Sequence, residues 1–399
     1  MTTSSGEPAG TGGRGAARPL AFVVLLGLVS LFADMTYEGA RSATGPFMGL
    51  LGASALAVAV VSSGGELVGY VLRFWSGRLV DRTGRHWAIT AIGYAVNLLA
   101  VPLLALAGHW PVAALLIVLE RAGKALRTPA RDAMLSYATS RMGRGWGFGL
   151  HEALDQVGAT IGPLIVAAAV LQSGSYRTGF AWLLLPAVAA LTVLAVAWRV
   201  FPNPHALEPA GNALSSRDLT RQYWVYLAAC CLMAAGYVDY PLLAFHFGAT
   251  GVVPNAWIPG LYGAAMAVDA LAAVAFGRWF DRRGLSVLTA STALGALAAP
   301  LALAGGPAGA IAGVLAWGVG MGAQESVVRA AVAGMAPPER RGSAYGTFNM
   351  AYGVSWFVGS AAGGWLYTRS PMWLAGFSLV LQVAAIPVLL AAARARRVE

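Results

Sequence analysis

The chain has 399 residues, of which 58% belong to the apolar set AVILMFWYC and only 11% are charged, and its mean hydropathy is +0.65. A soluble domain carries roughly 25% charged residues, so this composition excludes an ordinary soluble enzyme and a disordered chain and indicates a polytopic membrane protein. In a soluble protein the net charge of +10 would favour nucleic acid as a partner. Here the cations lie between apolar runs, which is typical of membrane topology, and we expect no nucleic acid.

Apolar runs follow one another along the chain, and each is long enough to cross ~30 Å of hydrocarbon as a helix rising ~1.5 Å per residue. The first six lie at about 19–41, 53–79, 87–107, 110–132, 146–171 and 180–201. The second six lie at about 222–248, 257–279, 285–305, 308–332, 343–368 and 371–393. We therefore expect an all-α membrane protein with twelve transmembrane helices in two six-helix bundles, 19–201 and 222–393.

Polar segments flank the two bundles. Residues 1–18 are glycine-rich and are not followed by a short apolar core with a cleavage site, so we expect a disordered cytoplasmic tail and no signal peptide. Residues 202–221 contain three prolines and are expected to form a cytoplasmic linker. Residues 394–399 are expected to form a second cytoplasmic tail.

The distribution of Lys and Arg predicts the orientation of the helices. If the N-terminus is cytoplasmic, 19 of these cations lie on the inner side, three on the outer side and five within the spans, which accounts for all 27. This asymmetry predicts a multi-pass protein with both termini in the cytoplasm. A single lysine among 26 arginines indicates a GC-rich bacterial genome, so we expect the cell (cytoplasmic/inner) membrane.

An internal repeat relates the two bundles. The segment GRLVDRTG at 77–84 recurs as GRWFDRRG at 277–284, an offset of 200 residues. The pattern of arginine and glycines across 144–162 recurs across 341–359, an offset of 197 residues. Two echoes in matching positions predict parallel repeats of six spans, related by an axis along the membrane normal.

These motifs resemble those of a known family. GRLVDRTGRH at 77–86 resembles motif A of the major facilitator superfamily, with the pattern G-x-x-x-D-R/K-x-G-R-R/K and a histidine at the last position. Gly158, Gly162 and Pro163 form a GxxxGP element similar to motif C, which is typical of the superfamily's proton-driven antiporters, although the trailing glycines of that motif are absent. Arg121 lies where those antiporters carry a membrane-embedded arginine. The resemblance implies a twelve-span transporter of the drug and metabolite antiporter group.

The charges of motif A suggest a gate. A carboxylate at the end of a helix can pair with an arginine at the inner end of another helix, so we expect Asp81 to pair with Arg131 and Asp281 with Arg329. Such pairs would hold the cytoplasmic side closed in one state, and simple topological anchoring is the alternative. The residues that we assign to this gate are Gly77, Asp81, Arg82, Gly84, Arg85, Arg131, Asp281, Arg282, Gly284 and Arg329.

The GxxxGP element suggests a bend in the fifth span. Gly158 and Gly162 share one helix face, and Pro163 removes a backbone donor, which permits a bend. Close packing against another helix is the alternative.

Charged residues within the spans cost at least ~2.5–3.5 kcal/mol each and are functional candidates for that reason. A carboxylate in a medium of low dielectric constant can be neutral near pH 7, and can therefore load and release a proton. We expect proton coupling from Glu120, Glu152 and Asp155, followed by Asp34 and Glu38. The expected counter-charges or substrate-binding residues are Arg121, Lys124, Arg127, Glu66 and Arg73. For any single carboxylate a structural ion pair is the alternative.

Two transport hypotheses follow. The first is proton-coupled efflux of a small, partly apolar molecule such as a drug or metabolite. The alternative is a proton-coupled symporter or exchanger of a small organic anion, because Lys124, Arg127 and Arg131 form a cationic stripe. Whether this stripe faces the cavity or the acids of the fifth span discriminates between the two. A third hypothesis is a membrane receptor or scaffold that transports nothing.

Other classes of function find no support in the motifs. Lys124 is followed by alanine, so no Walker A motif is present, and no nucleophile–base or metal-ligand spacing is found. We therefore expect no enzyme activity, no metal and no cofactor. The expected partners are a small-molecule substrate, protons and the lipid bilayer, and we expect a monomer.

Overall fold

The computed structural model describes residues 12–139, 144–203, 220–328, 331–332, 335 and 341–395. Within these residues every regular element is helical. The helices of the first half are α1 (Gly12–Leu50), α2 (Ala55–Thr83), α3 (His86–Leu103), η1 (Leu104–Leu106), α4 (Trp110–Thr139), α5 (Arg144–Ser173), α6 (Tyr176–Trp182) and α7 (Leu184–Val200). The helices of the second half are α8 (Arg221–Gly236), α9 (Tyr240–Thr250), α10 (Trp257–Arg283), α11 (Ser286–Ala296), α12 (Ala298–Ala304), α13 (Gly306–Ala323), η3 (Gln324–Val328), α15 (Arg341–Arg369) and α16 (Pro371–Ala395).

Grouped end to end, these elements form twelve rods, as the apolar runs predict. The paired elements are α3 with η1, α6 with α7, α8 with α9, α11 with α12, and α13 with η3. By length and apolar character, ten of the described segments qualify as membrane spans. The other two rods, α4 and α15, are 30 and 29 residues long, but they carry more polar and charged side chains. The protein is therefore a multi-pass, all-helical membrane protein.

One expected boundary differs from the helix that the structure shows. Helix α1 begins at Gly12, inside the segment 1–18 that was expected to be a disordered tail, because the helix of the first apolar run continues beyond that run toward the N-terminus. The linker residues 204–219 and the tail residues 396–399 lie outside the described residues.

Motif A forms the last turn of α2 and, in its second copy, of α10. Both helices end in a glycine with left-handed backbone, Gly84 at φ 64° and Gly284 at φ 65°. The N–H of Gly84 donates to the carbonyl of Val80, and that of Gly284 donates to the carbonyl of Phe280, each at 2.8 Å. These glycines are required because a side chain at this φ would be strained.

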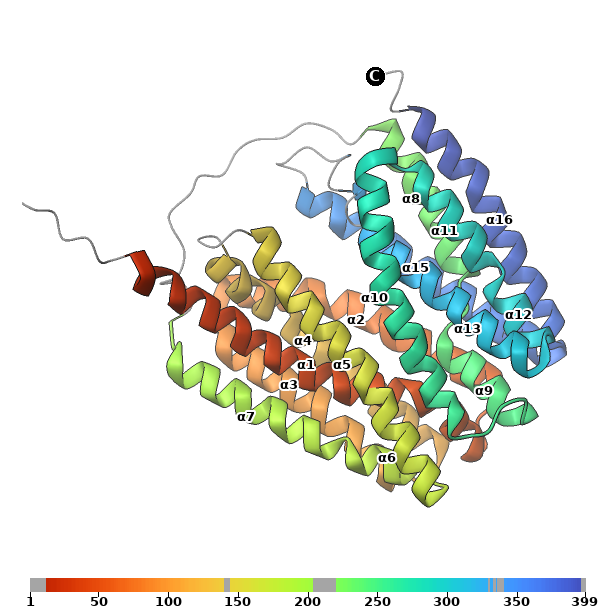
Figure 1. Cartoon of the computed structure of the whole chain (residues 1–399), viewed down its shortest axis with the longest axis horizontal. Coiled ribbons are helices and arrows are strands. Elements are labelled where there is room, and N and C mark those ends of the chain that lie inside the picture. Colours follow the sequence, from red (N-terminus) through yellow and green to blue (C-terminus); the bar gives the residue numbers. More distant parts are fainter. Residues whose placement is uncertain are drawn as a thin grey trace, which may run out of the picture.

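The two halves meet at one end of the bundle and separate at the other (Figure 1). Helix α1 contacts α9, α2 contacts α15, and α5 contacts α10. At the end remote from the chain termini the halves are tightly packed: a Cβ on Gly364 of α15 would lie 2.6 Å from Cβ of Ala59 in α2. The Tyr176 hydroxyl also donates to the carbonyl of Asn255 at 3.2 Å there. We call this end the closed side, and the end where α1 begins and α16 ends the terminal side.

The internal repeat appears in the packing of the helices. A Cβ on Gly162 of α5 would clash with the carbonyl oxygen of Met35 in α1. At the equivalent place in the second half, a Cβ on Gly359 of α15 would clash with the carbonyl oxygen of Ala235 in α8. Glycine is therefore needed at both positions for close helix approach. This supports the packing interpretation of the GxxxGP element, and α5 continues as one helix through Pro163.

Candidate functional site

A cavity of about 390 Å³ lies between the two halves. It reaches toward the terminal side, where the Asp132 side chain is 44% exposed. Its walls come from α1, α2, α4 and α5 of the first half and from α10, α13, η3 and α15 of the second. The charged residues among its walls are Asp34, Glu38, Glu66, Asp132, Glu152, Asp155, Asp269, Glu325, Arg41, Arg73, Lys124, Arg127 and Arg131. The volume is typical of a site for a small organic molecule.

The charges are distributed unequally between the halves. All of the Arg and Lys residues among the described walls belong to the first half, as do six of the carboxylates. The described wall of the second half contributes Asp269 and Glu325, with amide and aromatic groups from Gln324, Asn349 and Tyr352. A charged molecule in the cavity would therefore meet both signs of charge on one side and carboxylates on the other.

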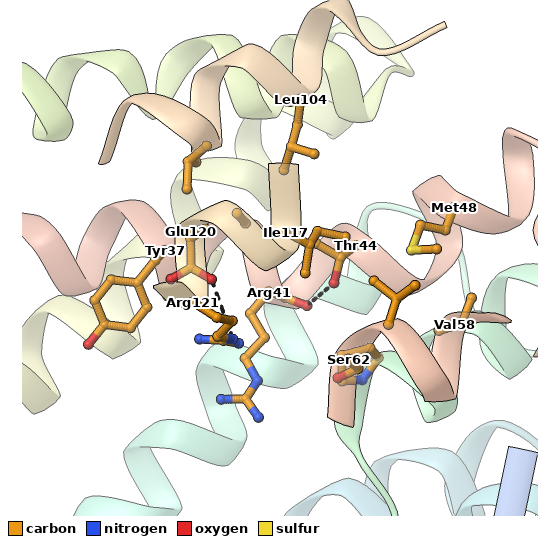
Figure 2. Close-up of a pocket in the computed structure, with 14 residues that line it drawn as sticks. Tyr37, Arg41, Thr44, Met48, Val58, Ser62, Leu104, Ile117, Glu120 and Arg121 are labelled. Atoms are coloured by element: carbon orange, nitrogen blue, oxygen red, sulfur yellow. Dashed lines mark hydrogen bonds and ion pairs between the residues drawn. The ribbon is translucent and has the colours of Figure 1, made fainter. Parts of the chain in front are cut away.

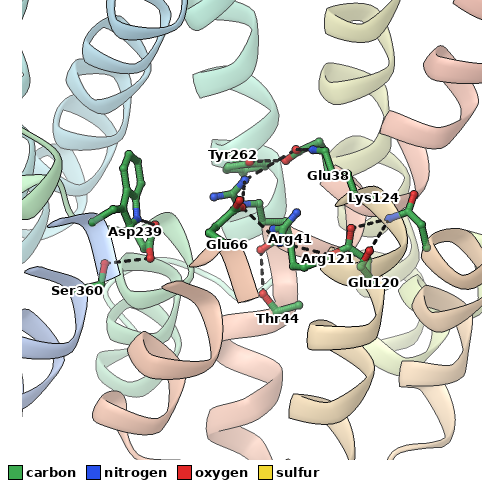
Figure 3. Close-up of polar contacts among 12 residues, drawn as sticks. Glu38, Arg41, Thr44, Glu66, Glu120, Arg121, Lys124, Asp239, Tyr262 and Ser360 are labelled. Atoms are coloured by element: carbon green, nitrogen blue, oxygen red, sulfur yellow. Dashed lines mark hydrogen bonds and ion pairs between the residues drawn. The ribbon is translucent and has the colours of Figure 1, made fainter. Parts of the chain in front are cut away.

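Charged side chains form a connected network between the cavity and the closed side (Figure 3). Glu66 of α2 links two arginines: its Oε1 lies 3.6 Å from Nη1 of Arg41 in α1 and 3.3 Å from Nε of Arg121 in α4. Arg121 also lies 3.4 Å from Oε2 of Glu120. The Asn97 side-chain amide donates to Glu120 Oε1 at 2.7 Å. We call Glu38, Arg41, Glu66, Glu120, Arg121 and Lys124 the central network.

Glu38 is a member of this network that accepts a hydrogen bond from the second half. The Tyr262 hydroxyl of α10 donates to Glu38 Oε2 at 2.5 Å. The other oxygen, Oε1, lies 3.9 Å both from Arg41 Nη1 and from Lys124 Nζ. A change in the charge of Glu38 would therefore alter attractions within the first half and a hydrogen bond between the halves at the same time.

A second chain of polar contacts crosses α1, α4 and α5 nearer the terminal side. His151 Nδ1 lies 3.4 Å from Asp155 Oδ2, and His151 Nε2 lies 3.0 Å from the Ser30 hydroxyl. Arg131 donates to that hydroxyl at 3.0 Å and to the carboxylate of Asp132 at 2.8 Å. Ser30 and His151 are buried, so this chain joins the three helices inside the first half.

The described residues do not test the predicted gate. Arg131 is bonded to Ser30 and Asp132. The side chains of Asp81 and Asp281 and the whole of Arg329 lie outside the part that the structure describes. Arg82, Arg85 and Arg282 are exposed at the ends of α2 and α10.

Two of the predicted cations stand over aromatic rings in the cavity wall. Lys124 Nζ lies 3.9 Å from the ring centre of Tyr37. The Arg127 guanidinium lies 4.2 Å from the ring centre of Tyr94 and 5.8 Å from that of Tyr37. Arg127 is only 1% exposed, and none of its three side-chain nitrogens has a hydrogen-bond partner. The Tyr37 hydroxyl itself donates to Asp34.

The second half contains two buried carboxylates that differ in their surroundings. Asp239 precedes α9 at the break after α8, and its oxygens accept hydrogen bonds from Trp356 Nε1 at 2.8 Å and from the Ser360 hydroxyl at 3.1 Å (Figure 3). Asp269, in the middle of α10, is 1% exposed, and its Oδ1 has no hydrogen-bond partner. The predicted site omitted both residues, although a carboxylate within an apolar run was a usable signal for each.

A small void of about 20 Å³ lies on the closed side of the central network (Figure 2). Its polar end is formed by Arg41, Glu120 and Arg121, and side chains such as Met48 and Leu104 form its apolar end. A space of this size accommodates about one water molecule. The closed side is therefore sealed against a solute, while the main cavity holds room for one.

The predicted site residues fall into two groups. Glu38, Glu66, Glu120, Arg121 and Lys124 belong to the central network, together with Arg41, which the sequence did not single out. The others that line the cavity are Asp34, Arg73, Arg127, Glu152 and Asp155. Glu120 borders the small void instead of the main cavity. The described residues contain no group of three potential metal ligands.

A bundle of two similar six-helix halves around a polar cavity defines a membrane transporter. The particular family follows from comparison with known proteins: the model of the Major Facilitator Superfamily matches residues 25–307 and 240–398, so the chain belongs to this superfamily. An uncharacterized protein of Mycobacterium tuberculosis strain H37Rv is 42% identical over 388 residues, which covers 94% of this chain and 95% of that protein. An uncharacterized MFS-type transporter of Methanocaldococcus jannaschii is 30% identical over 140 residues, 35% of each chain.

Solved structures share the fold. The nucleoside transporter NupG has a TM-score of 0.71 at 12% identity, covering 94% of this chain and 98% of its own. A mutant of the peptide transporter POT has a TM-score of 0.74 at 14% identity, covering 96% of this chain and 98% of its own. At these identities the likeness establishes the fold alone.

Proposed function

We propose that this transporter moves a small charged organic solute, carrying an anionic group, in exchange or together with protons. The observation that carries the proposal is that the cationic stripe faces the cavity. Lys124, Arg127 and Arg131 all line the cavity, and among the described ion pairs none joins them to Glu152 or Asp155. A cavity with such walls favours a charged solute over a partly apolar drug, because desolvated cations gain most from an anionic partner.

Glu38 is the residue that we assign to coupling. Protonation of its carboxylate removes the charge that attracts Arg41 and Lys124, and it alters the hydrogen bond from Tyr262 of the other half. The packing of the halves at the closed side then depends on the proton. Alternating access requires this link between ion binding and the relative position of the halves.

The charge distribution supports an orientation. The terminal side carries the exposed arginines of motif A, Arg82, Arg85 and Arg282, and cytoplasmic ends of helices are enriched in such residues. We therefore assign the terminal side to the cytoplasm of a bacterial cell, and the cavity to the state open to the cytoplasm.

The test uses purified protein in liposomes that contain a pH-sensitive dye. Alkanoates, amino acids, lipophilic cations and neutral drugs are added outside, one at a time, and the internal pH is recorded. We expect a charged solute with an anionic group to cause a pH change, and Glu38→Gln to abolish it while solute exchange across the membrane continues. Asp239→Asn is the matched control, because its carboxylate accepts from Trp356 and Ser360 and does not line the main cavity.

The direction of the pH change separates symport from antiport. Proton movement driven only by lipophilic cations or neutral drugs would refute the proposed substrate class and favour the efflux hypothesis. Solute movement without any pH change, or full coupling in Glu38→Gln, would refute the assigned coupling.

A further inference from the structure

Several buried side-chain atoms in the cavity wall have no hydrogen-bond partner, and the two most deeply buried ionisable residues among them lie in opposite halves of the protein. One is the Arg127 guanidinium in α4 of the first half. The other is Oδ1 of Asp269 in α10 of the second half. Both side chains are 1% exposed and both line the same cavity. Buried polar groups without partners are costly, so two such ionisable residues in one cavity require an explanation.

The protein offers Arg127 aromatic faces in place of hydrogen-bond acceptors. Tyr94 and Tyr37 lie 4.2 and 5.8 Å from its guanidinium carbon. The carboxylates of Asp34 and Asp155 act electrostatically on it without a hydrogen bond; Asp34 accepts from Tyr37, and one oxygen of Asp155 pairs with His151 while the other has no partner. A guanidinium has five donors in a planar fork that matches a carboxylate or phosphate, and ring contacts satisfy none of them. The missing partner of Arg127 is thus an anionic group.

Asp269 is placed where a cation would be stabilised. The charged groups that act on it most strongly are carboxylates, those of Glu325, Glu152 and Glu38. Its Oδ1 lies beside Gly322 of α13, where a Cβ would clash with the Asp269 carbonyl oxygen and stand 2.6 Å from Oδ1, so glycine is needed there for α10 and α13 to approach each other. The described second-half wall of the cavity holds no Arg or Lys to neutralise it. The missing partner of Asp269 is thus a cationic group.

We propose that the solute is a small zwitterion, with its carboxylate or other anionic group on Arg127 and its ammonium group on Asp269. This inference rests on the proposed transport function and names its substrate class. A zwitterion would bridge the two halves across the cavity and would favour their approach at the terminal side. A molecule with only an anionic group would reach the cations of the first half alone and would give no such bridge.

The test is calorimetric titration of the purified full-length protein at pH 7, without a membrane or a gradient. The probes are straight-chain ω-amino acids of increasing length, with alkylamines and alkanoates of the same lengths. We expect one length of amino acid to bind about 10- to 100-fold tighter than the matched amine and alkanoate, the gain typical of one additional charged contact. This comparison needs no variant and therefore stands even if a substitution prevents folding.

Variants then test which residue binds each charged end of the amino acid. Arg127→Gln should reduce the affinity for the amino acid to that for the matched amine, and Asp269→Asn should reduce it to that for the matched alkanoate. Arg199→Gln, at an exposed arginine outside the cavity, and Asp239→Asn, at a buried carboxylate with two protein donors, should preserve the preference for the zwitterion.

Three results would overturn the inference: no preference for the zwitterion at any length, an unchanged preference in both cavity variants, or dependence on Asp269 alone. The last result would make Asp269 a site for a lone cation or a proton. Tight zwitterion binding without a pH change in liposomes would refute proton coupling and leave the inference intact. A pH change driven by simple alkanoates, with no gain from the ammonium group, would refute the inference and leave the proposed function intact.

Discussion

Tyr262→Phe isolates the hydrogen bond that joins the two halves at the central network. The hydroxyl donates to Glu38 over 2.5 Å, and a hydrogen bond to a charged group contributes about 1.5–3 kcal/mol. The bond is present in the state that is open to the terminal side. Its loss should therefore favour the opposite state, in which the closed side opens, and increase that population about 10- to 100-fold.

Cysteine labelling measures this population even when it is small. Ala59 is fully buried on the closed side, so a cysteine there reacts with a membrane-impermeant maleimide only after that side opens. Replacing Cys230 and Cys231 with alanine removes the native thiols. When reclosing is faster than labelling, the labelling rate follows the open population, and we expect the rate to rise by the same factor.

Tyr240→Phe is the matched control. Tyr240 packs against the Tyr262 ring at 4.4 Å, and its hydroxyl donates to the carbonyl of Ile258 within the same half. It should leave the labelling rate unchanged. A wild-type labelling rate in Tyr262→Phe, or an equal increase in both variants, would refute the assignment of the Glu38–Tyr262 bond as a link between the halves.

Three further predictions concern stability, each checked by thermal denaturation of the purified protein. Gly162→Ala should lower the unfolding free energy by about 1–3 kcal/mol, because the new methyl group clashes with Met35, whereas Gly69→Ala, at an open position, should not lower it. Ser360→Ala should cost about 1 kcal/mol, since Asp239 retains its bond from Trp356. Glu66→Gln should cost more than Ser360→Ala, because it leaves both Arg41 and Arg121 without their shared carboxylate; equal losses would contradict this ranking.

The twelve rods could be predicted from the sequence because a helix that crosses a bilayer needs a long apolar run. Such runs can be recognised in the sequence without knowing which other helices they contact. The boundaries were less accurate where polar residues continue the helix, as at Gly12 and in the motif A turn that ends at Gly84. The charged residues within the apolar runs likewise include most of the charged residues that line the cavity. Such charges are recognisable in the sequence because they interrupt a run that lies in the membrane, whatever their contacts are.

The pairing of those charges could not be predicted, since it depends on which helices face one another. Glu38 was expected to carry a proton, but its bond to Tyr262, 224 residues away, needs the contact between α1 and α10. Arg41 was not among the predicted site residues, yet it lies beside Glu66 in the central network. Asp269 was not among the predicted site residues, because nothing in its sequence neighbours shows that its oxygen lacks a partner.

Because the two halves are repeats, residues at equivalent positions can be compared, and some of them differ in charge. The offset of 197 residues pairs Arg127 with Gln324 and Asp155 with Tyr352. In the second half these counterparts satisfy each other, since the Tyr352 hydroxyl donates to Gln324 Oε1 at 2.8 Å. In the first half the same positions carry charges, and the guanidinium remains without an acceptor.

The same contrast holds at the network itself. The offset of 200 residues pairs Glu38 with Val238, and the offset of 197 residues pairs Glu120 with Trp317. The Trp317 indole donates to the carbonyl of Val238 at 2.8 Å. The second half thus uses neutral hydrogen bonds where the first half uses ion pairs. A neutral bond is insensitive to protons near pH 7, whereas a carboxylate can respond to them. The proposed coupling therefore falls on the first half, and the hydrogen bond from Tyr262 is the described contact through which the second half would register it.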